Sequence, residues 1–244
     1  MRVYSCVVIF LCIFCANGAS VTQNSCPMPP KFKTNYDFNW KSRDHEWSNT
    51  NARTDYLVLS LSWSPSFCAS LSTAARNREF QCTRSDSFGL IVHGLWPQKS
   101  GTTSFRDQPR NCRDDQQLST SLIKRFYCLI PDEDLMQGEW EKHGLFINFI
   151  ERIFYMNVFF LGSCYFETPM EYFTTIERLY NQLNIPDIRA IRNPTYTSIK
   201  NAFLALNSPK LFASAIYVRM DQQGQLDEIR FCYDLNYRFI SCYQ

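Results

Sequence analysis

Residues 88–96 read Phe-Gly-Leu-Ile-Val-His-Gly-Leu-Trp, an apolar run interrupted by one imidazole, that of His93. Apolar and β-branched side chains at this density predict a buried β-strand. We expect Pro97 to end the strand, because proline has no N–H to donate to a sheet. Residues 56–63, Tyr-Leu-Val-Leu-Ser-Leu-Ser-Trp, predict a second core strand, which the following Ser-Pro-Ser breaks.

The rest of the chain mixes helical and strand patterns without a regular alternation. Residues 68–82 predict a polar helix and loop, and residues 98–117 predict a long polar loop. Apolar spacing predicts helices over residues 118–127, 134–144, 170–183 and 197–206. Two more strands, over 212–220 and 226–233, are joined by the turn sequence Asp-Gln-Gln-Gly. This irregular mixture favours the α+β class.

Composition and charge exclude several classes of protein. The chain has 244 residues, 45% hydrophobic and 20% charged, which excludes a disordered, collagen-like or coiled-coil protein. This length is enough for one large domain or two small ones. The formal net charge of +2 excludes a strongly basic nucleic-acid coat, so any contact with nucleic acid must be local.

The N-terminus has the pattern of a secretory signal peptide. Arg2 precedes an apolar run, and small residues follow it. We expect cleavage after Gly18, which would remove residues 1–18. An N-terminal anchor is the alternative, although the run is short for a bilayer span. Residues 19–54 are polar and contain several prolines, which predicts an irregular lead-in to a domain over 55–244.

The signal peptide would also account for an odd number of cysteines. The chain has 11, and cleavage after Gly18 removes three of them. An even set in an exported chain predicts disulfides. The remaining cysteines are Cys26, Cys68, Cys82, Cys112, Cys128, Cys164, Cys232 and Cys242.

Two of the three histidines occupy settings that suit catalysis. His93 ends a predicted strand, and Gly94 after it would let a ligand approach the backbone. His143 follows Glu139 by four residues on a predicted helix, and Lys142 follows Glu139 by three, so all three share one face. A carboxylate, a cation and an imidazole together suit a reaction at phosphate. The imidazole moves a proton near neutral pH, and the lysine offsets developing negative charge.

Each of these features also has an ordinary structural explanation. A histidine at a strand end is more often structural than catalytic, and a Glu-Lys-His helix face is usually a solvated surface. A metal site is possible, but the histidines lack the close His-x-x-x-His or Cys-x-x-Cys spacing. Residue types and spacing alone therefore leave catalysis as one hypothesis among several.

The two histidine segments resemble the two active-site blocks of the T2 ribonucleases. Leu90-Ile-Val-His93-Gly-Leu-Trp-Pro97 resembles the first block, and Leu135-Met-Gln-Gly-Glu139-Trp-Glu-Lys142-His143-Gly144 resembles the second. Residues 56–68 resemble the first core strand of the family and its first disulfide cysteine. The resemblance runs from about residue 55 to the C-terminus. It implies an α+β fold in which helices pack on a central antiparallel sheet.

The chain departs from the family pattern directly after the second block. The family continues His-Gly-x-Cys, whereas Leu145 and Phe146 follow Gly144 here. Deleting residues 145–162 restores the pattern, so we interpret this segment as an insertion. Its codons would be A/T-rich and its length is in frame, which favours a retained intron or alternative transcript; a lineage-specific loop is the alternative. As a continued helix it would rise about 27 Å, so it must loop back if Cys164 is to keep its disulfide.

The resemblance assigns disulfide pairs as well. It implies Cys68–Cys82, Cys112–Cys164 and Cys232–Cys242, which leaves Cys26 and Cys128 to pair by elimination.

The resemblance further implies an RNA-cleaving enzyme that uses neither a metal nor another cofactor. His143 would take the proton from the ribose 2′-OH, and His93 would protonate the departing 5′ oxygen. Glu139 and Lys142 would stabilise the phosphorane, with Lys142 as the phosphate-binding cation. The product would be a 2′,3′-cyclic phosphate, later hydrolysed to a 3′-phosphate. The required 2′-OH excludes DNA.

The expected partner is single-stranded RNA, bound by a monomer that is secreted or lysosomal. Trp96 and Trp140 are the candidate base-binding residues, because stacking on an aromatic ring tolerates any base. Core packing is the alternative role of both tryptophans. Many relatives carry His where Gly138 stands, so one phosphate contact would be missing here. His45 matches neither block and is expected at the surface.

Two other functions remain open at this point. The first is a ribonuclease-like binding or storage protein whose catalysis is impaired by the insertion at 145–162. Inactive relatives would be expected to lose a histidine, and both are present here. The second is a secreted protein that binds a partner through the apolar insertion itself.

Overall fold

The computed structural model describes residues 26–86, 88–144 and 165–242. The expected signal peptide, the first residues of the lead-in and the segment interpreted as an insertion lie outside the described residues.

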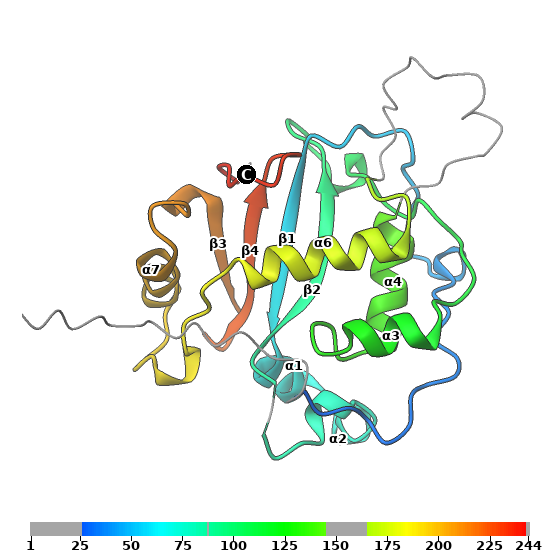
Figure 1. Cartoon of the computed structure of the whole chain (residues 1–244), viewed down its shortest axis with the longest axis horizontal. Helices are drawn as coiled ribbons and strands as arrows, with labels where there is room; N and C mark the ends of the chain where they lie inside the picture. Colours follow the sequence, from blue (N-terminus) through cyan, green and yellow to red (C-terminus); the bar gives the residue numbers. More distant parts are fainter. Residues whose placement is uncertain (1–25, 87, 145–164, 243–244) are drawn as a thin grey trace, which may run out of the picture.

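Four antiparallel strands form the described sheet, in the order β2-β1-β4-β3 (Figure 1). The strands are β1 (Tyr56–Trp63), β2 (Leu90–Gln98), β3 (Ile216–Met220) and β4 (Leu226–Tyr233). The α+β class and the antiparallel sheet are therefore confirmed. The turn between β3 and β4 is also as expected, since Gly224 there has a φ of +76° that favours glycine.

The expectation that Pro97 ends the second strand is wrong. Strand β2 continues through Pro97 to Gln98, and Pro97 pairs with Leu57 of β1. The physical reason is position: β2 is the end strand of the described sheet, and an edge strand tolerates a residue that cannot donate on its open side.

The predicted helices are present with ends shifted by a few residues. They are α3 (Thr120–Phe126), α4 (Glu133–His143), α6 (Pro169–Asn181) and α7 (Tyr196–Asn207), preceded by the short α1 (Ser64–Ser70) and α2 (Thr73–Arg76). Side-chain caps determine where α4 and α6 begin, because Asp132 and Thr168 accept hydrogen bonds from backbone N–H groups of the first turns. The strand predicted over 212–220 starts later, since Ala213–Ala215 form a 3-10 turn.

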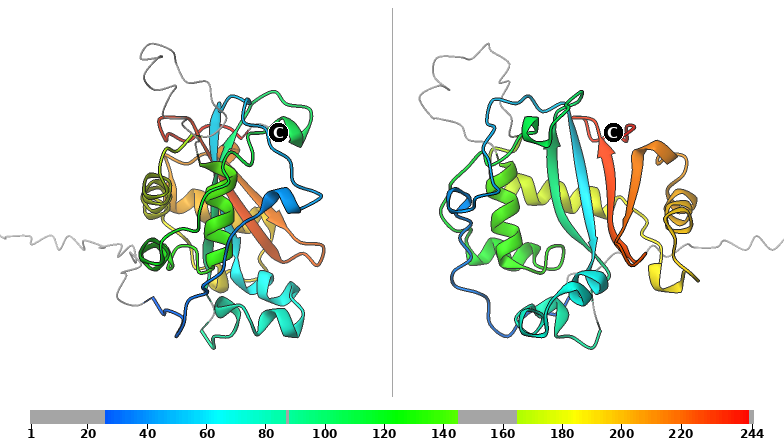
Figure 2. Two further views of the ribbon diagram at one scale, coloured as in Figure 1. Left: turned by 90° about the vertical axis from the view of Figure 1, so that its right-hand side faces the viewer. Right: turned by 180° about the vertical axis from the view of Figure 1, so that it is seen from behind.

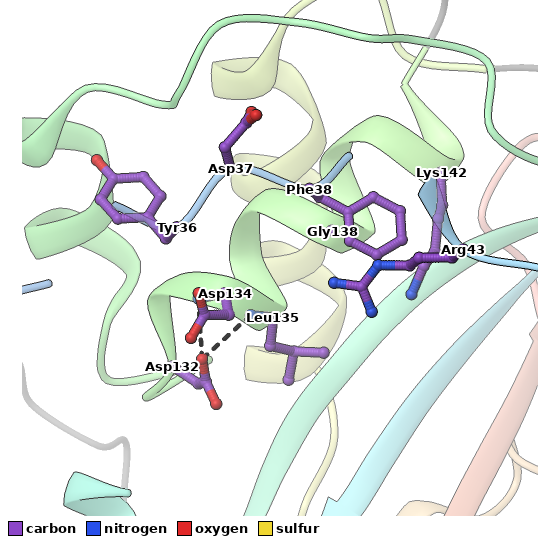
Figure 3. Close-up of a pocket in the computed structure, with 9 residues that line it drawn as sticks. All are labelled: Tyr36, Asp37, Phe38, Arg43, Asp132, Asp134, Leu135, Gly138 and Lys142. Carbon is purple, nitrogen blue, oxygen red and sulfur yellow. Dashed lines mark hydrogen bonds between the residues drawn. The ribbon is translucent and has the colours of Figure 1, made fainter. Parts of the chain in front are cut away.

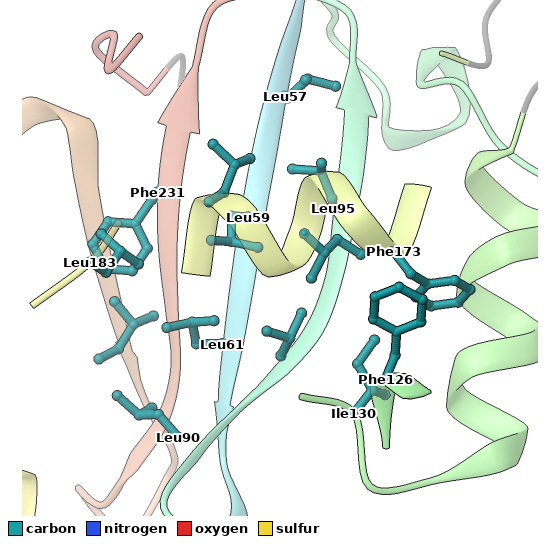
Figure 4. Packing of buried hydrophobic residues seen from close by; sticks show 14 of the residues in the cluster. Leu57, Leu59, Leu61, Leu90, Leu95, Phe126, Ile130, Phe173, Leu183 and Phe231 are labelled. Atoms are coloured by element: carbon teal, nitrogen blue, oxygen red, sulfur yellow. The ribbon is translucent and has the colours of Figure 1, made fainter. Parts of the chain in front are cut away.

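The core lies between the sheet and the helices. Leu57, Leu59 and Leu61 alternate along β1 toward α6, which crosses the sheet, and Phe173 of α6 stacks on Phe126 of α3 (Figure 4). In the view turned by 90°, α3 and α6 lie to one side of the sheet (Figure 2). The other face of the sheet carries a small apolar cluster of Tyr56, Val58 and Cys232 together with polar side chains.

A register shift in β2 decides which side chains reach that outer face. Ser60 of β1 pairs with Gly94, but the next residue, Leu61, pairs with Val92, so His93 is an extra residue in β2. Such a β-bulge changes the inward–outward alternation. Val92 and Leu95 both enter the core although they are three positions apart in the strand. His93 is thereby left on the outer face.

The described part of the lead-in packs along α4 with little regular structure. Its one 3-10 turn is Trp40–Ser42. The Tyr36 hydroxyl donates to the carbonyl of Leu118 at 2.6 Å, and the indole N–H of Trp40 donates to the carbonyl of Arg113 at 3.0 Å. These contacts hold the described part of the lead-in against the rest of the domain with one 3-10 turn as its regular structure.

Three disulfides join described cysteines: Cys26–Cys128, Cys68–Cys82 and Cys232–Cys242. They are the pairs expected from the family pattern and from elimination. The expected Cys112–Cys164 bond involves Cys164, which lies outside the described residues. On either side of that gap, Gly144 and Phe166 form an isolated parallel bridge.

Candidate active site

Strand β2 and helix α4 bring the candidate catalytic residues together. Helix α4 lies beside β2 (Figure 1). The bulge turns His93 outward, and Glu139, Lys142 and His143 share one face of α4. His143 is the last residue of α4, and Gly144 adopts an extended conformation there. A Cβ on Gly144 would lie 2.6 Å from the Trp140 ring, so this close turn requires glycine.

The carboxylate of Glu139 is the centre of the cluster. Its Oε1 lies 3.8 Å from Nε2 of His93 and 3.1 Å from Nζ of Lys142. Its Oε2 lies 3.6 Å from Nε2 of His143 and accepts the indole N–H of Trp96 at 2.7 Å. One buried carboxylate therefore contacts both imidazoles and the lysine, which is the grouping that the sequence suggested.

Gly94 permits this arrangement, although for a different reason from the one expected. A Cβ at this position would lie 2.2 Å from Oε2 of Glu139 and 2.8 Å from Nε1 of Trp96. The groups that approach the backbone at Gly94 are thus the protein's own side chains. The expectation that a ligand takes this space is wrong.

Burial and neighbouring charges set opposite protonation states on the two α4 groups. Burial alone would raise the pKa of Glu139, but Lys142, His93 and His143 together with the Trp96 hydrogen bond outweigh it and lower that pKa to about 2. Burial lowers the pKa of His143 to about 3, and Lys142 adds to this effect while Glu139 opposes it. A neutral His143 beside an ionised Glu139 is a proton acceptor at ordinary pH.

The environment of His93 includes two residues that the sequence did not indicate. Its Nδ1 lies 3.3 Å from Oγ of Ser62 on β1 and 3.8 Å from Oε2 of Glu228 on β4. Glu228 is 2% exposed and is the one acidic residue at a buried position of β4. The sequence gives little signal for Glu228, because the same strand also contains Asp227 and Arg230, and its partner depends on cross-strand register.

The two candidate base-binding tryptophans have different environments. Trp96 is half-buried at the site, with its ring centre 5.3 Å from that of His93 and the Arg230 guanidinium 5.1 Å from its centre. Trp140 is fully buried and its indole N–H donates to Asp115 at 3.0 Å. A stacked base needs an open ring face, so the interpretation of Trp140 as a base wall is wrong and core packing is its role.

A cavity of about 290 Å³ opens beside the cluster, between α4 and the lead-in (Figure 3). Lys142, Gly138 and Leu135 line it from α4, and Phe38 and Arg43 line it from the lead-in. A Cβ on Gly138 would lie 3.3 Å from the Phe38 ring, so this ring takes part of the room that a longer side chain at 138 would use. The cavity is lined by side chains of both charges: Lys142 and Arg43 are positive, and Asp132 and Asp134 are negative.

The other sequence expectations concern a metal and His45. Across the described ranges, no group of three His, Cys, Asp or Glu residues has the geometry to hold a metal ion. The His45 side chain is 78% exposed, as expected for a surface residue. No described helix is long and apolar enough to cross a membrane.

Comparisons with solved structures place the fold among the S-like and S ribonucleases. Trichomaglin, described as a novel S-like ribonuclease, matches with a TM-score of 0.52 and 18% identity over 78% of this chain and 92% of that one. The Japanese pear S3-RNase matches with a TM-score of 0.51 and 19% identity over 78% of this chain and 91% of that one. At this identity the two matches establish the fold.

Sequence comparisons establish the family. The Ribonuclease T2 family profile matches residues 54–242. A protein described as a probable ribonuclease from Haemophilus influenzae is 30% identical over 226 residues, which cover 90% of this chain and 72% of that protein. A ribonuclease from Aeromonas hydrophila is 39% identical over 90 residues, 37% of this chain and 36% of that protein. The family match and the relatives described as ribonucleases support a ribonuclease. The chain belongs to the Ribonuclease T2 family.

Proposed function

We propose that the chain is a metal-independent endoribonuclease that cleaves single-stranded RNA by transphosphorylation. The observation that carries the proposal is the double contact of Glu139: one oxygen lies near His93 and the other near His143. Two imidazoles around one carboxylate provide a proton acceptor and a proton donor at a single phosphate. Lys142, whose ammonium also contacts Glu139, provides the positive charge.

The first step transfers the 2′-oxygen to phosphorus. His143 takes the proton of the ribose 2′-OH, the 2′-oxygen attacks, and His93 protonates the 5′ oxygen as the P–O5′ bond breaks. Glu139 and Lys142 stabilise the crowded phosphorane between these events. The product is a 2′,3′-cyclic phosphate, which water later opens to a 3′-phosphate. The low pKa of His143 supports the base assignment, because the ring is neutral before the reaction.

The substrate class follows from what surrounds the cluster. A 2′-OH is required, so DNA is not cleaved. The cavity beside Lys142 would receive a nucleotide next to the scissile phosphate, and the Trp96 ring would contact a base. Stacking without base-edge readout supports low base specificity. We also propose that the protein acts as a monomer and is secreted or lysosomal, since its three described disulfides suit an oxidising compartment.

One experiment tests the reaction. Purified chain is incubated with single-stranded RNA and EDTA at pH 5 and pH 7, and the ends are identified by mass spectrometry. Cyclic phosphates are expected from the wild type and not from His93→Ala or His143→Ala. His45→Ala, a matched control at an exposed histidine, should cleave like the wild type, and DNA of the same sequence should stay intact.

The same assay distinguishes an active ribonuclease from the alternative, a ribonuclease-like binding or storage protein whose catalysis is impaired. A folded wild type that does not cleave RNA, together with an active chain lacking residues 145–162, would contradict the proposal for this polypeptide. A wild type that needs added divalent metal would contradict the metal-independent mechanism.

A further inference from the structure

We propose that Glu228 is a positioning residue for His93: it holds the proton on Nδ1 of the imidazole and so leaves Nε2 as the nitrogen that exchanges a proton with the RNA. The proposal deepens the catalytic role given to His93 above and rests on that role for its effect on rate. The arrangement itself is observed between β2 and β4, on the outer face of the sheet.

The geometry assigns different partners to the two ring nitrogens. Nδ1 faces Oε2 of Glu228 at 3.8 Å and Oγ of Ser62 at 3.3 Å, whereas Nε2 faces Oε1 of Glu139 at 3.8 Å. Each ring nitrogen faces a carboxylate oxygen at 3.8 Å, and what distinguishes Nδ1 is the additional Oγ of Ser62 at 3.3 Å, which can accept its proton while Glu228 attracts it. The hydrogen bond made by one imidazole nitrogen determines which form the other nitrogen takes. Nε2, on the side of Glu139 and Lys142, is then free for the reaction.

Glu228 is fixed by strong interactions of its own. Nη2 of Arg219 donates to Oε2 at 3.0 Å, and Nε of Arg230 is in ion-pair contact with Oε1. The carboxylate is 2% exposed, so water does not screen it from His93. Two arginines from neighbouring strands thus orient the carboxylate, and the carboxylate in turn faces the imidazole.

Each of the two arginines also contacts a second side chain. The Arg230 guanidinium lies 5.1 Å from the centre of the Trp96 ring, and Trp96 donates to Glu139. Nε of Arg219 contacts Asp227 at 2.7 Å, which holds its other side. A chain of contacts therefore runs from β3 through Glu228 to His93. Arg219, Glu228 and Arg230 belong to the β3–β4 hairpin, which lies outside both active-site blocks.

The charged groups around His93 come from three elements. Helix α4 presents Glu139, Lys142 and His143; β4 presents Glu228 and Arg230; β3 presents Arg219. Replacing Glu228 by glutamine removes one of the two carboxylates near the ring and leaves both arginines. The lost negative charge no longer stabilises the imidazolium of His93, and the two arginines, now without their counter-ion, repel it. Both effects make His93 easier to deprotonate.

The test is nitrogen-15 NMR of the full chain labelled at histidine, which has three such residues. In the wild type we expect neutral His93 to carry its proton on Nδ1. In Glu228→Gln, with the fold checked by the spectrum, we expect the His93 ring to lose its proton at a pH about one unit lower or more. The matched control is Glu177→Gln, which removes the same charge from α6, on the opposite face of the sheet from His93, and should change this pH little.

A second readout is the pH profile of RNA cleavage. We expect Glu228→Gln to lower kcat roughly tenfold to a hundredfold with little change in KM, less than the loss of a general acid itself. The alkaline limb should move to lower pH, and Glu228→Asp should recover part of the rate. Should Glu228→Gln not fold, the wild-type tautomer and Glu228→Asp decide the question.

Two results would overturn the proposal: a wild-type His93 whose neutral form carries the proton on Nε2, or a folded Glu228→Gln whose His93 titrates as in the wild type. The NMR measurement does not depend on cleavage. A wild type that fails to cleave RNA would therefore contradict the proposed function while the relation between Glu228 and His93 is still decided.

Discussion

The carboxylate of Glu139 occupies the space that a side chain at Gly94 would need, since a Cβ there would lie 2.2 Å from Oε2. Strand β2 and helix α4 can therefore approach closely enough to put His93 and His143 on the same carboxylate. Glycine at this position is therefore a requirement of the site.

Gly94→Ala should lose both activity and stability. The methyl group must displace Glu139 or Trp96, and a displacement of about 1 Å in a catalytic group can lower a rate a hundredfold. We expect kcat/KM on RNA to fall by about that factor, with a stability loss of about 1–3 kcal/mol from overpacking. Gly89→Ala is the matched control, because its Cβ would lie 3.6 Å from Trp63, an ordinary contact. Equal activity in both variants would contradict this account.

The acid limb of the pH–rate profile should lie far below that of an ordinary histidine. The proposed base must be deprotonated, and the pKa of His143 is lowered to about 3, so the rate should rise with pH through about 3 and be level by pH 5. Glu139 raises the pKa of His143 and Lys142 lowers it. Glu139→Gln should thus move the limb to lower pH and Lys142→Met to higher pH, each with a lower plateau. Shifts in the same direction would exclude His143 as the group titrated.

Glu141 should make the folded state less stable as pH rises from 4.5 to 7. Burial raises its pKa to about 7, and Asp37, Asp114 and Asp115 add to this, whereas the hydrogen bond from Gln137 opposes it. Between these pH values the folded chain binds more protons than the unfolded chain, so protonation stabilises it at low pH and the gain is lost as pH rises.

Glu141→Gln should therefore be more stable than the wild type at pH 7, by on the order of 2 kcal/mol, with the advantage gone at pH 4.5. Urea denaturation at a series of pH values measures this. Glu167→Gln, at an exposed carboxylate, should follow the wild type. A constant difference between Glu141→Gln and the wild type across this range would contradict the prediction.

Conservative changes at the two tryptophans should separate catalysis from stability. Trp96→Phe removes the indole N–H that Glu139 accepts, so the pKa of Glu139 should rise from about 2 and the cleavage rate should fall. Trp140→Phe removes a buried hydrogen bond to Asp115 and leaves a small void, at a cost of about 1–3 kcal/mol in stability. Cleavage rates per folded molecule and urea midpoints measure the two effects. A larger loss of rate in Trp140→Phe would show that this ring acts on the site.

Much of the fold could be predicted because the relevant signals are local. Strands β1 and β4 have the predicted bounds, since dense apolar and β-branched residues mark them between clear breaks. The site face of α4 could also be predicted, because a helix brings residues three and four apart onto one side. Pro97 was misjudged because the rule for proline depends on whether a strand is at an edge, which is a property of the sheet.

The sequence by itself determined the elements, the pair of histidine segments, and the carboxylate and lysine on the helix that carries His143. Tertiary structure alone decided that a bulge turns His93 outward, that Trp140 is buried while Trp96 borders the site, and that Glu228 and Ser62 face Nδ1 of His93. The physical reason is the distance along the sequence over which each determinant acts. Helix periodicity acts within a few residues, whereas strand register and burial depend on which distant segments pack together.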